Sequence, residues 1–397
     1  RSLDAAEAPL AGHIVSGVPV YDGAFVDSLE LGTDRHRELL TEWATMLADG
    51  PGCLAIRGAY ADTAVLDEAA EVFFSIIEEE RAAGGGGGDH FAKAGANDRI
   101  WNSHEKLAVR APEVFTRYYS NATIAGAATA WLGPHYQLTA QVNVVNPGGD
   151  AQNPHRDYHL GFYLPEQTFD FPLHVHRMSA MLTLQGAVAH SDMPIESGPT
   201  KILPWSQHYR AGFAIAKRPE FDQVFEDRFV QIELRKGDAL FFNPALLHAA
   251  GQNRTSDVIR MANLMQISSA FGRAMEWRDT DAMCLAVYPH LAAADLKPRG
   301  CRASGGGRSR GLRLPDLARP RPADRRTRPR IAGRHLASRP HRGVGDRRVR
   351  QSAQRAQPPA TARTLRSQPP SRSIRRRILP EADFGISATN STKRICL

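Results

Sequence analysis

The chain has 397 residues and a formal net charge of +8, a total that sums two very different parts. Residues 1–300 hold 25 of the 50 Lys and Arg residues and 37 of the 42 Asp and Glu residues, a net charge of −12, whereas residues 301–397 carry a net charge of +20. The larger part therefore has an ordinary acidic composition and enough length for a large core.

Several classes of protein are excluded by simple features. No apolar run reaches 18 residues and no signal-peptide pattern opens the chain, so we expect neither a membrane span nor secretion. Four scattered cysteines without a Cys-x-x-Cys pair exclude a disulfide framework and a zinc–thiolate site. Together these features predict a cytoplasmic protein.

After an N-terminal extension, residues 1–33, residues 34–135 are predicted to form a helical flank. Apolar residues recur at helical spacing, and Asp34 is the expected N-cap of the first helix. A run of glycines at 84–88 interrupts this pattern, and because no Gly-Lys-Ser/Thr sequence follows, it is not a phosphate-binding loop. The predicted elements are helices over 34–49, 62–82 and 112–132, and a short buried strand over 53–60.

From residue 136 onward the pattern is that of β-strands. Short apolar segments alternate with turn sequences such as Pro-Gly-Gly, Ser-Gly-Pro and Lys-Gly-Asp. The predicted strands are 137–149, 174–188, 200–204, 228–235, 239–244 and 258–268. Strands of this length and spacing after N-terminal helices predict a mainly β fold with flanking α-helices, a jelly roll whose core spans 136–270 within a domain of residues 34–297.

The tail, residues 298–397, is a separate problem. It is rich in Arg, Pro, Gly and Ser, and it lacks periodicity, so we expect it to be disordered. One interpretation is a basic arm that binds nucleic acid through phosphate contacts. However, Phe384 is the only Phe, Trp or Tyr after residue 300, and Lys is nearly absent. This composition favours the other interpretation, translation of GC-rich DNA out of frame, so nucleic acid is not the expected partner.

A candidate metal site begins at the sequence His-Arg-Asp-Tyr-His. His155 and Asp157 are two residues apart, so on an extended chain both side chains project to the same face. His248, in a distant strand candidate, is the expected third ligand. Each feature alone is common in loops or cores, but two His and one carboxylate together are the facial ligand set of non-haem Fe(II) oxygenases. That set leaves three coordination positions open.

If the reductant is 2-oxoglutarate, its far carboxylate needs a cation at a fixed place. Arg260 lies 12 residues beyond His248 on the next predicted strand, and its fork can bind a carboxylate through two hydrogen bonds. Arg254 is the competitor, in the polar turn Asn-Arg-Thr-Ser-Asp. We favour Arg260 and keep Arg254 as the alternative.

Three segments carry a resemblance to a known family. They are QVNVVNPGGDAQNPHRDYH, ESGPTKILPWSQHYR and RKGDALFFNPALLHAAGQNRTSDVIR. In order and spacing they resemble the phytanoyl-CoA dioxygenase family, over roughly residues 35–290. The match departs from the family where Trp205 replaces a usual Gly, where Gln207 separates Ser206 from His208, and in a longer spacing from His248 to Arg260.

The resemblance implies a double-stranded β-helix that uses Fe(II), 2-oxoglutarate and O₂. It implies iron on His155, Asp157 and His248, and the co-substrate carboxylate on Arg260. The implied reaction is hydroxylation of an unactivated C–H bond in a small-molecule or acyl substrate, because halogenating relatives replace the carboxylate that Asp157 supplies.

Two further polar residues are candidates for contact with the co-substrate. Gln141 and Thr183 lie on predicted strands, where an ordinary structural role is the competing interpretation. Two alternative functions stay open for the whole chain: a catalytically impaired β-barrel that only binds its ligand, and nucleic-acid binding through the tail. The substrate and the oligomeric state are not specified by the sequence.

Overall fold

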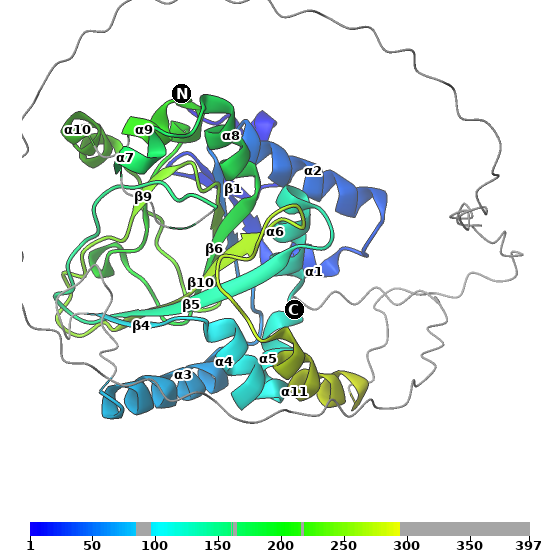
Figure 1. The fold of residues 1–397 in the computed structure, drawn as a ribbon. Helices are drawn as coiled ribbons and strands as arrows, with labels where there is room; N and C mark the ends of the chain where they lie inside the picture. The colour runs from blue at the N-terminus through cyan, green and yellow to red at the C-terminus, as the bar shows by residue number, and fades with distance from the viewer. Residues whose placement is uncertain (85–96, 160, 162–164, 216–217, 294–397) are drawn as a thin grey trace, which may run out of the picture. The chain divides into compact units, whose positions relative to one another are not determined.

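An eight-stranded β-sheet forms the framework of the fold (Figure 1). The computed structural model describes residues 1–84, 97–159, 161, 165–215 and 218–293. In spatial order the strands are β1 (His13–Val15), β2 (Val18–Asp22), β3 (Cys53–Arg57), β8 (Ala239–Phe242), β6 (Thr183–Ala189), β10 (Arg260–Ser268), β5 (Gln137–Val145) and β4 (Asn97–Ile100). β2 and β3 are parallel and every other pair is antiparallel.

A second, smaller sheet pairs β7 (Lys201–Leu203) with β9 (Leu247–Ala249). Isolated bridges extend it, from His155 to His248 and from Ile202 to Val230. An apolar layer that includes Val20, Ala55, Ile202, Ile232, Leu240 and Phe242 lies inside the fold. Because strand residues alternate between faces, each of these large-sheet residues has an outward neighbour that faces the helices. The prediction of a mainly β jelly roll with flanking helices is confirmed.

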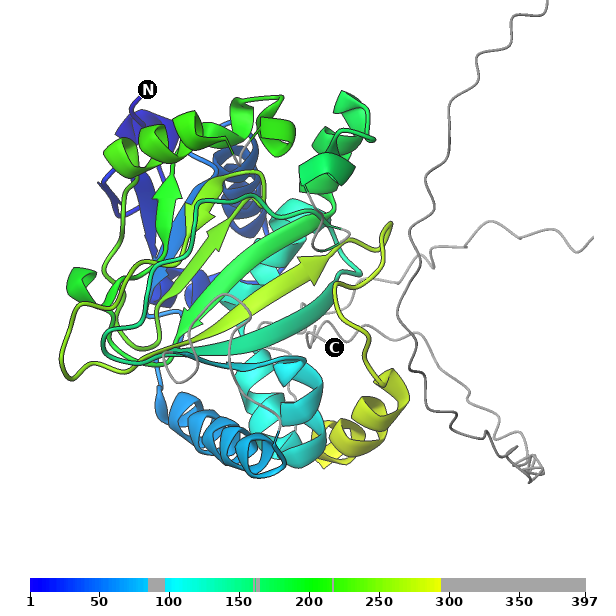
Figure 2. The ribbon, with the colours of Figure 1, turned by 60° about the vertical axis from the view of Figure 1, so that its left-hand side comes forward.

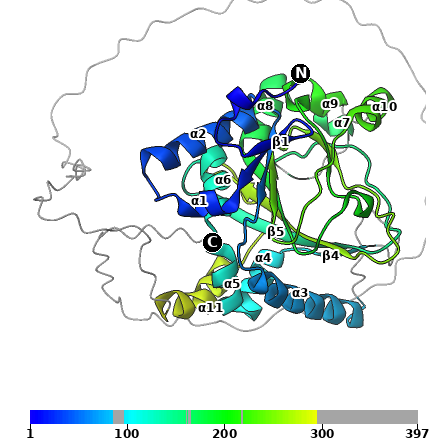
Figure 3. The same ribbon diagram turned by 180° about the vertical axis from the view of Figure 1, so that it is seen from behind.

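Helices lie on both sides of the large sheet. The longer ones are α1 (Gly23–Ser28), α2 (Asp34–Ala48), α3 (Ala64–Ala82), α4 (Ser103–Arg110), α5 (Pro112–Tyr119), α6 (Ala122–Leu132), α8 (Leu173–Met181), α10 (Pro219–Arg228) and α11 (Thr280–Ala293), and the shorter ones are α7 (Pro165–Thr168) and α9 (Gly212–Ile215). Figures 1 and 3 show α1, α2 and α6 on one side of the sheet, with α7, α9, α10 and β9 on the other. α11 packs against α4 and α5.

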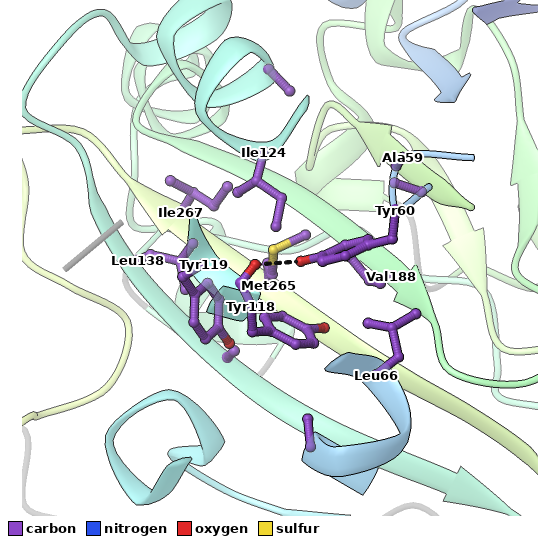
Figure 4. Packing of buried hydrophobic residues seen from close by; sticks show 14 of the residues in the cluster. Ala59, Tyr60, Leu66, Tyr118, Tyr119, Ile124, Leu138, Val188, Met265 and Ile267 are labelled. Carbon is purple, nitrogen blue, oxygen red and sulfur yellow. Dashed lines mark hydrogen bonds between the residues drawn. The ribbon is translucent and has the colours of Figure 1, made fainter. Parts of the chain in front are cut away.

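The main core lies between the outer face of this sheet and the helices α2 to α6 and α11. Figure 4 shows aromatic and aliphatic side chains meeting there, with the hydroxyl of Tyr60 donating to the carbonyl of Tyr118 at 2.8 Å. Leu138 and Ile267 on the sheet, and Ile124 on α6, are fully buried around them. This packing leaves the inner face of the sheet free to carry the polar residues described below.

Most predicted elements appear near their expected bounds, but the first helix is capped differently. The helix begins at Asp34, and Thr33 is its N-cap, with the Thr33 hydroxyl accepting from the backbone N–H of His36 at 3.3 Å. The prediction of Asp34 as N-cap was therefore wrong by one residue. The strand predicted over 53–60 is β3, and it is shorter than expected because Gly58 turns the chain with a φ of 60°.

The single helix predicted over 112–132 is two helices, α5 and α6. The chain breaks between them, and Asn121 begins the second helix by accepting from the backbone N–H of Ile124 at 2.9 Å. An Asn side chain competes with helix hydrogen bonds and favours a cap, which explains the break. The apolar periodicity continues on both sides of Asn121, so the sequence pattern did not show the break.

The strand predicted over 174–188 is a helix followed by a strand. Residues 173–181 form α8, and only 183–189 pair as β6. The predicted strand over 228–235 is also wrong as a strand, because only Val230 and Leu234 make isolated bridges. Neither segment could be assigned by apolar pattern alone, since short apolar runs fit both states.

β1 and β2 arise from the N-terminal extension and join the large sheet through β3. The glycine run at 84–88, apart from Gly84, and the tail from residue 298 lie outside the described residues. Among the helices of the described part of the chain, none is long and apolar enough to cross a membrane.

Candidate functional site

The three predicted metal ligands come together between the two sheets. One ligand atom each from His155, Asp157 and His248 lies within 4.8 Å of the other two. The Nε2 atom of His155 is 3.8 Å from one carboxylate oxygen of Asp157, and the Nε2 atom of His248 is 3.7 Å from the other. The chain therefore gathers one carboxylate and two imidazoles, from segments about 90 residues apart, around one point.

Backbone pairing positions the two histidines. His155 and His248 exchange both backbone hydrogen bonds at 3.0 Å, which places their rings 4.4 Å apart between centroids. The backbone N–H of Asp157 donates to the carbonyl of Pro244 at 3.1 Å, so the second ligand is held against the segment that precedes His248.

Each imidazole is also oriented by its second nitrogen. Nδ1 of His155 bonds the carbonyl of Asn153 and Nδ1 of His248 bonds the carbonyl of Leu246, both at 2.9 Å. A carbonyl oxygen can only accept a hydrogen bond, so Nδ1 carries the ring proton and Nε2 is left as the basic atom that faces Asp157. This is the arrangement that a metal-binding histidine requires.

The carboxylate of Asp157 is held in its charged form. Burial alone raises its pKa, but the two imidazoles beside it and the amide of Gln185 together lower the pKa well below its usual range. Gln185, on β6, donates from Nε2 to Oδ2 of Asp157. The sequence analysis missed this residue, and its inward position on a buried strand was the available signal.

Arg260 and Arg254 differ sharply in position. Arg260 is the first residue of β10, is 6% exposed and lines the same cavity as the three ligands, whereas Arg254 is exposed. Nη1 of Arg260 donates to the carbonyls of Ser197 at 2.6 Å and Gly251 at 3.2 Å. Because one nitrogen takes both carbonyls, the rest of the fork remains for a carboxylate. Burial lowers the pKa of Arg260 to about 10, so it stays charged at neutral pH.

The two additional polar candidates are placed differently. Gln141 lines the cavity, while Thr183 is buried outside the set of lining residues, with its hydroxyl 2.7 Å from Nδ1 of His159. This geometry supports the structural interpretation for Thr183.

Arg156 is a second residue that the sequence analysis missed. It stands between the two ligands of the His-Arg-Asp sequence, and its guanidinium donates to the carbonyls of Ser206 and Tyr209. The hydroxyl of Ser206 in turn accepts from the backbone N–H of Leu247 at 2.8 Å, next to His248. Arg156 therefore connects the two segments that carry the ligands, and burial lowers its pKa to about 10.

These residues line a cavity of about 670 Å³ on the inner face of the large sheet. Figure 2 shows β5, β6 and β10, which supply much of its wall, running side by side. Period-two alternation explains the lining: Arg260, Ala262, Leu264 and Gln266 share one face of β10. A cavity of this size fits a small molecule beside a metal centre.

A comparison with models of known families identifies the family of this chain. Residues 48–262 match the model described as phytanoyl-CoA dioxygenase (PhyH). The chain belongs to the phytanoyl-CoA dioxygenase family. The matched range contains His155, Asp157, His248 and Arg260. Members of the family are non-haem iron, 2-oxoglutarate-dependent enzymes.

Individual relatives of this phytanoyl-CoA dioxygenase family member are distant. The dioxygenase trt7 of Aspergillus terreus (strain NIH 2624 / FGSC A1156) is 27% identical over 139 residues, 35% of this chain and 43% of the relative. The alignment thus spans less than half of that curated relative.

Similar solved structures include two enzymes from nogalamycin biosynthesis and one from Streptomyces hygroscopicus. The epimerase SnoN is 20% identical with a TM-score of 0.40, covering 59% of this chain and 82% of its own. The carbocyclase SnoK is 20% identical with a TM-score of 0.43, covering 62% and 86%. HygX, solved with nickel and 2-oxoglutarate bound, is 16% identical with a TM-score of 0.39, covering 62% and 90%.

Proposed function

We propose that this chain is an Fe(II)- and 2-oxoglutarate-dependent dioxygenase that hydroxylates an unactivated C–H bond of a small molecule or acyl substrate. The observation that carries the proposal is the convergence of His155, Asp157 and His248 on one point beside the buried Arg260. The donor set fits ferrous iron because two imidazoles and one carboxylate leave open positions, and because both Nε2 atoms face the carboxylate.

Each residue has a definite task in this proposal. His155, Asp157 and His248 hold the metal, and Gln185 holds Asp157 in the orientation that faces the histidines. Arg260 binds the distal carboxylate of 2-oxoglutarate, and the carbonyls of Ser197 and Gly251 fix its guanidinium. When bound, the iron supplies the oxidising chemistry, using O₂ and the electrons of 2-oxoglutarate.

The remaining cavity would position the substrate and keep water away from the metal centre. Phe242 packs on His248, with ring centroids 4.8 Å apart, and Ala187, Leu264 and Met193 add apolar wall. Asp157 favours hydroxylation over halogenation, because its carboxylate occupies the position that a halide would need. Gln141 remains a candidate contact for the co-substrate, and O₂ completes the proposed set of reactants.

Anaerobic titration with Fe(II) and 2-oxoglutarate tests the proposal. We expect the visible charge-transfer band of the chelate in the full chain. The band should be lost in His155→Ala and strongly weakened in Arg260→Leu at equal 2-oxoglutarate. Arg254→Leu is the matched control and should titrate like the unaltered protein. Absence of the band, or an unchanged band in His155→Ala, would overturn the assignment of the metal centre.

A further inference from the structure

A cluster of polar side chains lies on the cavity wall away from the metal ligands. It comprises Arg99 on β4, Gln141 on β5 and Glu276 in the segment between β10 and α11, and all three line the cavity. We refer to these three residues as the polar wall. Nη1 of Arg99 donates to Oε1 of Gln141 at 3.0 Å, and Nε2 of Gln141 donates to Oε1 of Glu276 at 3.4 Å.

Neighbouring contacts hold Glu276 firmly in this place. The backbone N–H of Asn102 donates to Oε1 of Glu276 at 3.1 Å. Glu105 accepts from the side chain of Asn102 at 2.7 Å and from the backbone N–H of Asp279 at 2.9 Å, and Arg278 donates to the carbonyl of Leu138 at 2.6 Å. The segment that carries Glu276 is therefore fixed to the start of α4 and to β5.

One oxygen of this carboxylate has no partner in the described part of the chain. Both hydrogen bonds to Glu276 reach Oε1, while Oε2 is buried without a hydrogen-bond partner. Burial raises the pKa of Glu276 above its usual range, against the hydrogen bonds of Asn102 and Gln141 and the charges of Lys106 and Arg99. A carboxylate oxygen without a donor is costly, and Glu276 lines the cavity, so a hydrogen-bond donor on a bound ligand would stabilise this side chain.

The polar wall lies within reach of a substrate at the metal centre. In the sheet register, Gln141 is opposite Leu264 of β10, which is opposite Ala187 of β6, two residues from Gln185. Two strand spacings separate β5 from β6, which is roughly 10 Å. A molecule with a ring or short chain between its reacting carbon and a polar group spans such a distance.

We infer that Glu276 is a substrate-specificity residue, which accepts a hydrogen bond from a hydroxyl or ammonium group of the substrate on the side remote from the metal. This inference rests on the proposed function, since it assigns Glu276 of the polar wall to the substrate of that reaction. It predicts a substrate that bears a donor group, and it makes a substrate with only an anion at this position a poor fit. Arg99 is the group that an anionic substrate would use instead.

Three probes on one carbon skeleton test the inference by calorimetric titration of the full chain without iron. All three are cyclohexane rings. 2-Deoxystreptamine carries ammonium and hydroxyl groups, myo-inositol carries hydroxyl groups only, and cyclohexanecarboxylate carries only an anion. We expect at least one donor probe to bind more tightly than cyclohexanecarboxylate. Glu276→Ala should weaken that binding about tenfold or more, as expected for the loss of a hydrogen bond to a charged group.

Two variants sharpen the result. Glu276→Gln removes the charge and keeps an amide, so it should weaken an ammonium ligand and spare a hydroxyl ligand. Asp281→Asn changes an exposed carboxylate on α11, outside the cavity lining, and should leave the dissociation constants unchanged. The inference is wrong if neither donor probe binds, if Glu276→Ala binds them as tightly as the unaltered chain, or if cyclohexanecarboxylate binds best.

The proposed function can fail independently of this inference. Because the titrations contain no iron, probe binding that depends on Glu276 would stand even if the charge-transfer band were absent. Conversely, an unchanged band in Glu276→Ala shows that the variant folds and loads normally, so a loss of probe binding in it belongs to the polar wall.

Discussion

At the scale of single residues, the proposed metal centre includes a neutral side chain that is not itself a ligand. Gln185 donates to Asp157 from β6, opposite Gln266 of β10 in the sheet register. A hydrogen bond of this kind orients a ligating carboxylate, and its loss typically costs tenfold to a hundredfold in metal affinity.

We therefore expect Gln185→Leu to weaken Fe(II) binding by about tenfold to a hundredfold. Titration of the charge-transfer band with Fe(II) at saturating 2-oxoglutarate measures the effect. Gln266→Leu, the same change on the neighbouring strand, is the control and should keep the affinity. Equal affinities in Gln185→Leu and the unaltered chain would show that Asp157 needs no such support.

A second residue, His190, is expected to make stability depend on pH. It follows β6 directly and is buried, with Nε2 2.9 Å from the hydroxyl of Tyr118. Burial lowers its pKa to about 4; the charge of Lys236 lowers the pKa further, while a hydrogen bond to the backbone of Leu66 and the charge of Asp67 oppose the shift. The folded chain therefore takes up a proton at this site less readily than the unfolded chain.

The sign of the effect follows from that difference. The contribution of His190 is fully present above the unfolded histidine pKa of about 6.5 and is lost as the pH falls toward the folded value. Between about pH 7.5 and about pH 5 we expect a loss of about 2 kcal/mol in the free energy of unfolding. Urea unfolding at both pH values should show this loss in the unaltered chain and a smaller loss in His190→Gln. An equal loss in both would contradict the assignment.

At the scale of elements, the boundary between α5 and α6 rests on one side chain. Oδ1 of Asn121 accepts from the backbone N–H of Ile124 at 2.9 Å, and Nδ2 donates to the carbonyl of Ala59 at 2.7 Å. Asn121 thus caps α6 and also holds it to the loop after β3.

Replacing Asn121 with Ala should lower the free energy of unfolding by about 1–2 kcal/mol, the upper range for an N-cap, because a second hydrogen bond is lost as well. Ser120→Ala, one residue earlier, removes only a hydroxyl that bonds within α5 at Thr116, and should cost less than about 0.5 kcal/mol. Urea unfolding of both variants measures the difference, and equal costs would contradict the role of the cap.

At the scale of the whole molecule, the described residues contain every residue to which the proposed site assigns a role. The two sheets, the helices, the three ligands and Arg260 all lie between residues 1 and 293. The basic excess, by contrast, lies in residues 301–397. The net charge of +8 is therefore no guide to what the cavity binds.

Deleting residues 301–397 should leave the charge-transfer band and the thermal midpoint unchanged, and it should abolish any salt-dependent binding to DNA that the full chain shows. The measurements are the anaerobic titration, a thermal melt and a DNA-binding titration at two salt concentrations. Loss of the band on deletion would show that the tail contributes to the fold or to the site.

Much of this molecule could be predicted from local patterns. Local sequence patterns predict the spacing of His155 and Asp157 and the apolar periodicity of α2, α3, β5 and β10. The same kind of pattern, a histidine in an apolar strand segment, indicates His248 as the distant third ligand. The resemblance to the phytanoyl-CoA dioxygenase family, which the family model confirms, rests on the same short segments.

Features that depend on contacts between distant parts of the chain could be seen only in the tertiary structure. It buried Arg260 and exposed Arg254, folded 173–181 as a helix, and brought Gln185 to Asp157 and Glu276 to Gln141. The sequence by itself determined which residues are chemically able to hold iron, because that depends on residue type and spacing. Which polar side chains support the ligands or face the substrate depends on strand register and burial, and these are set by residues far apart in the chain.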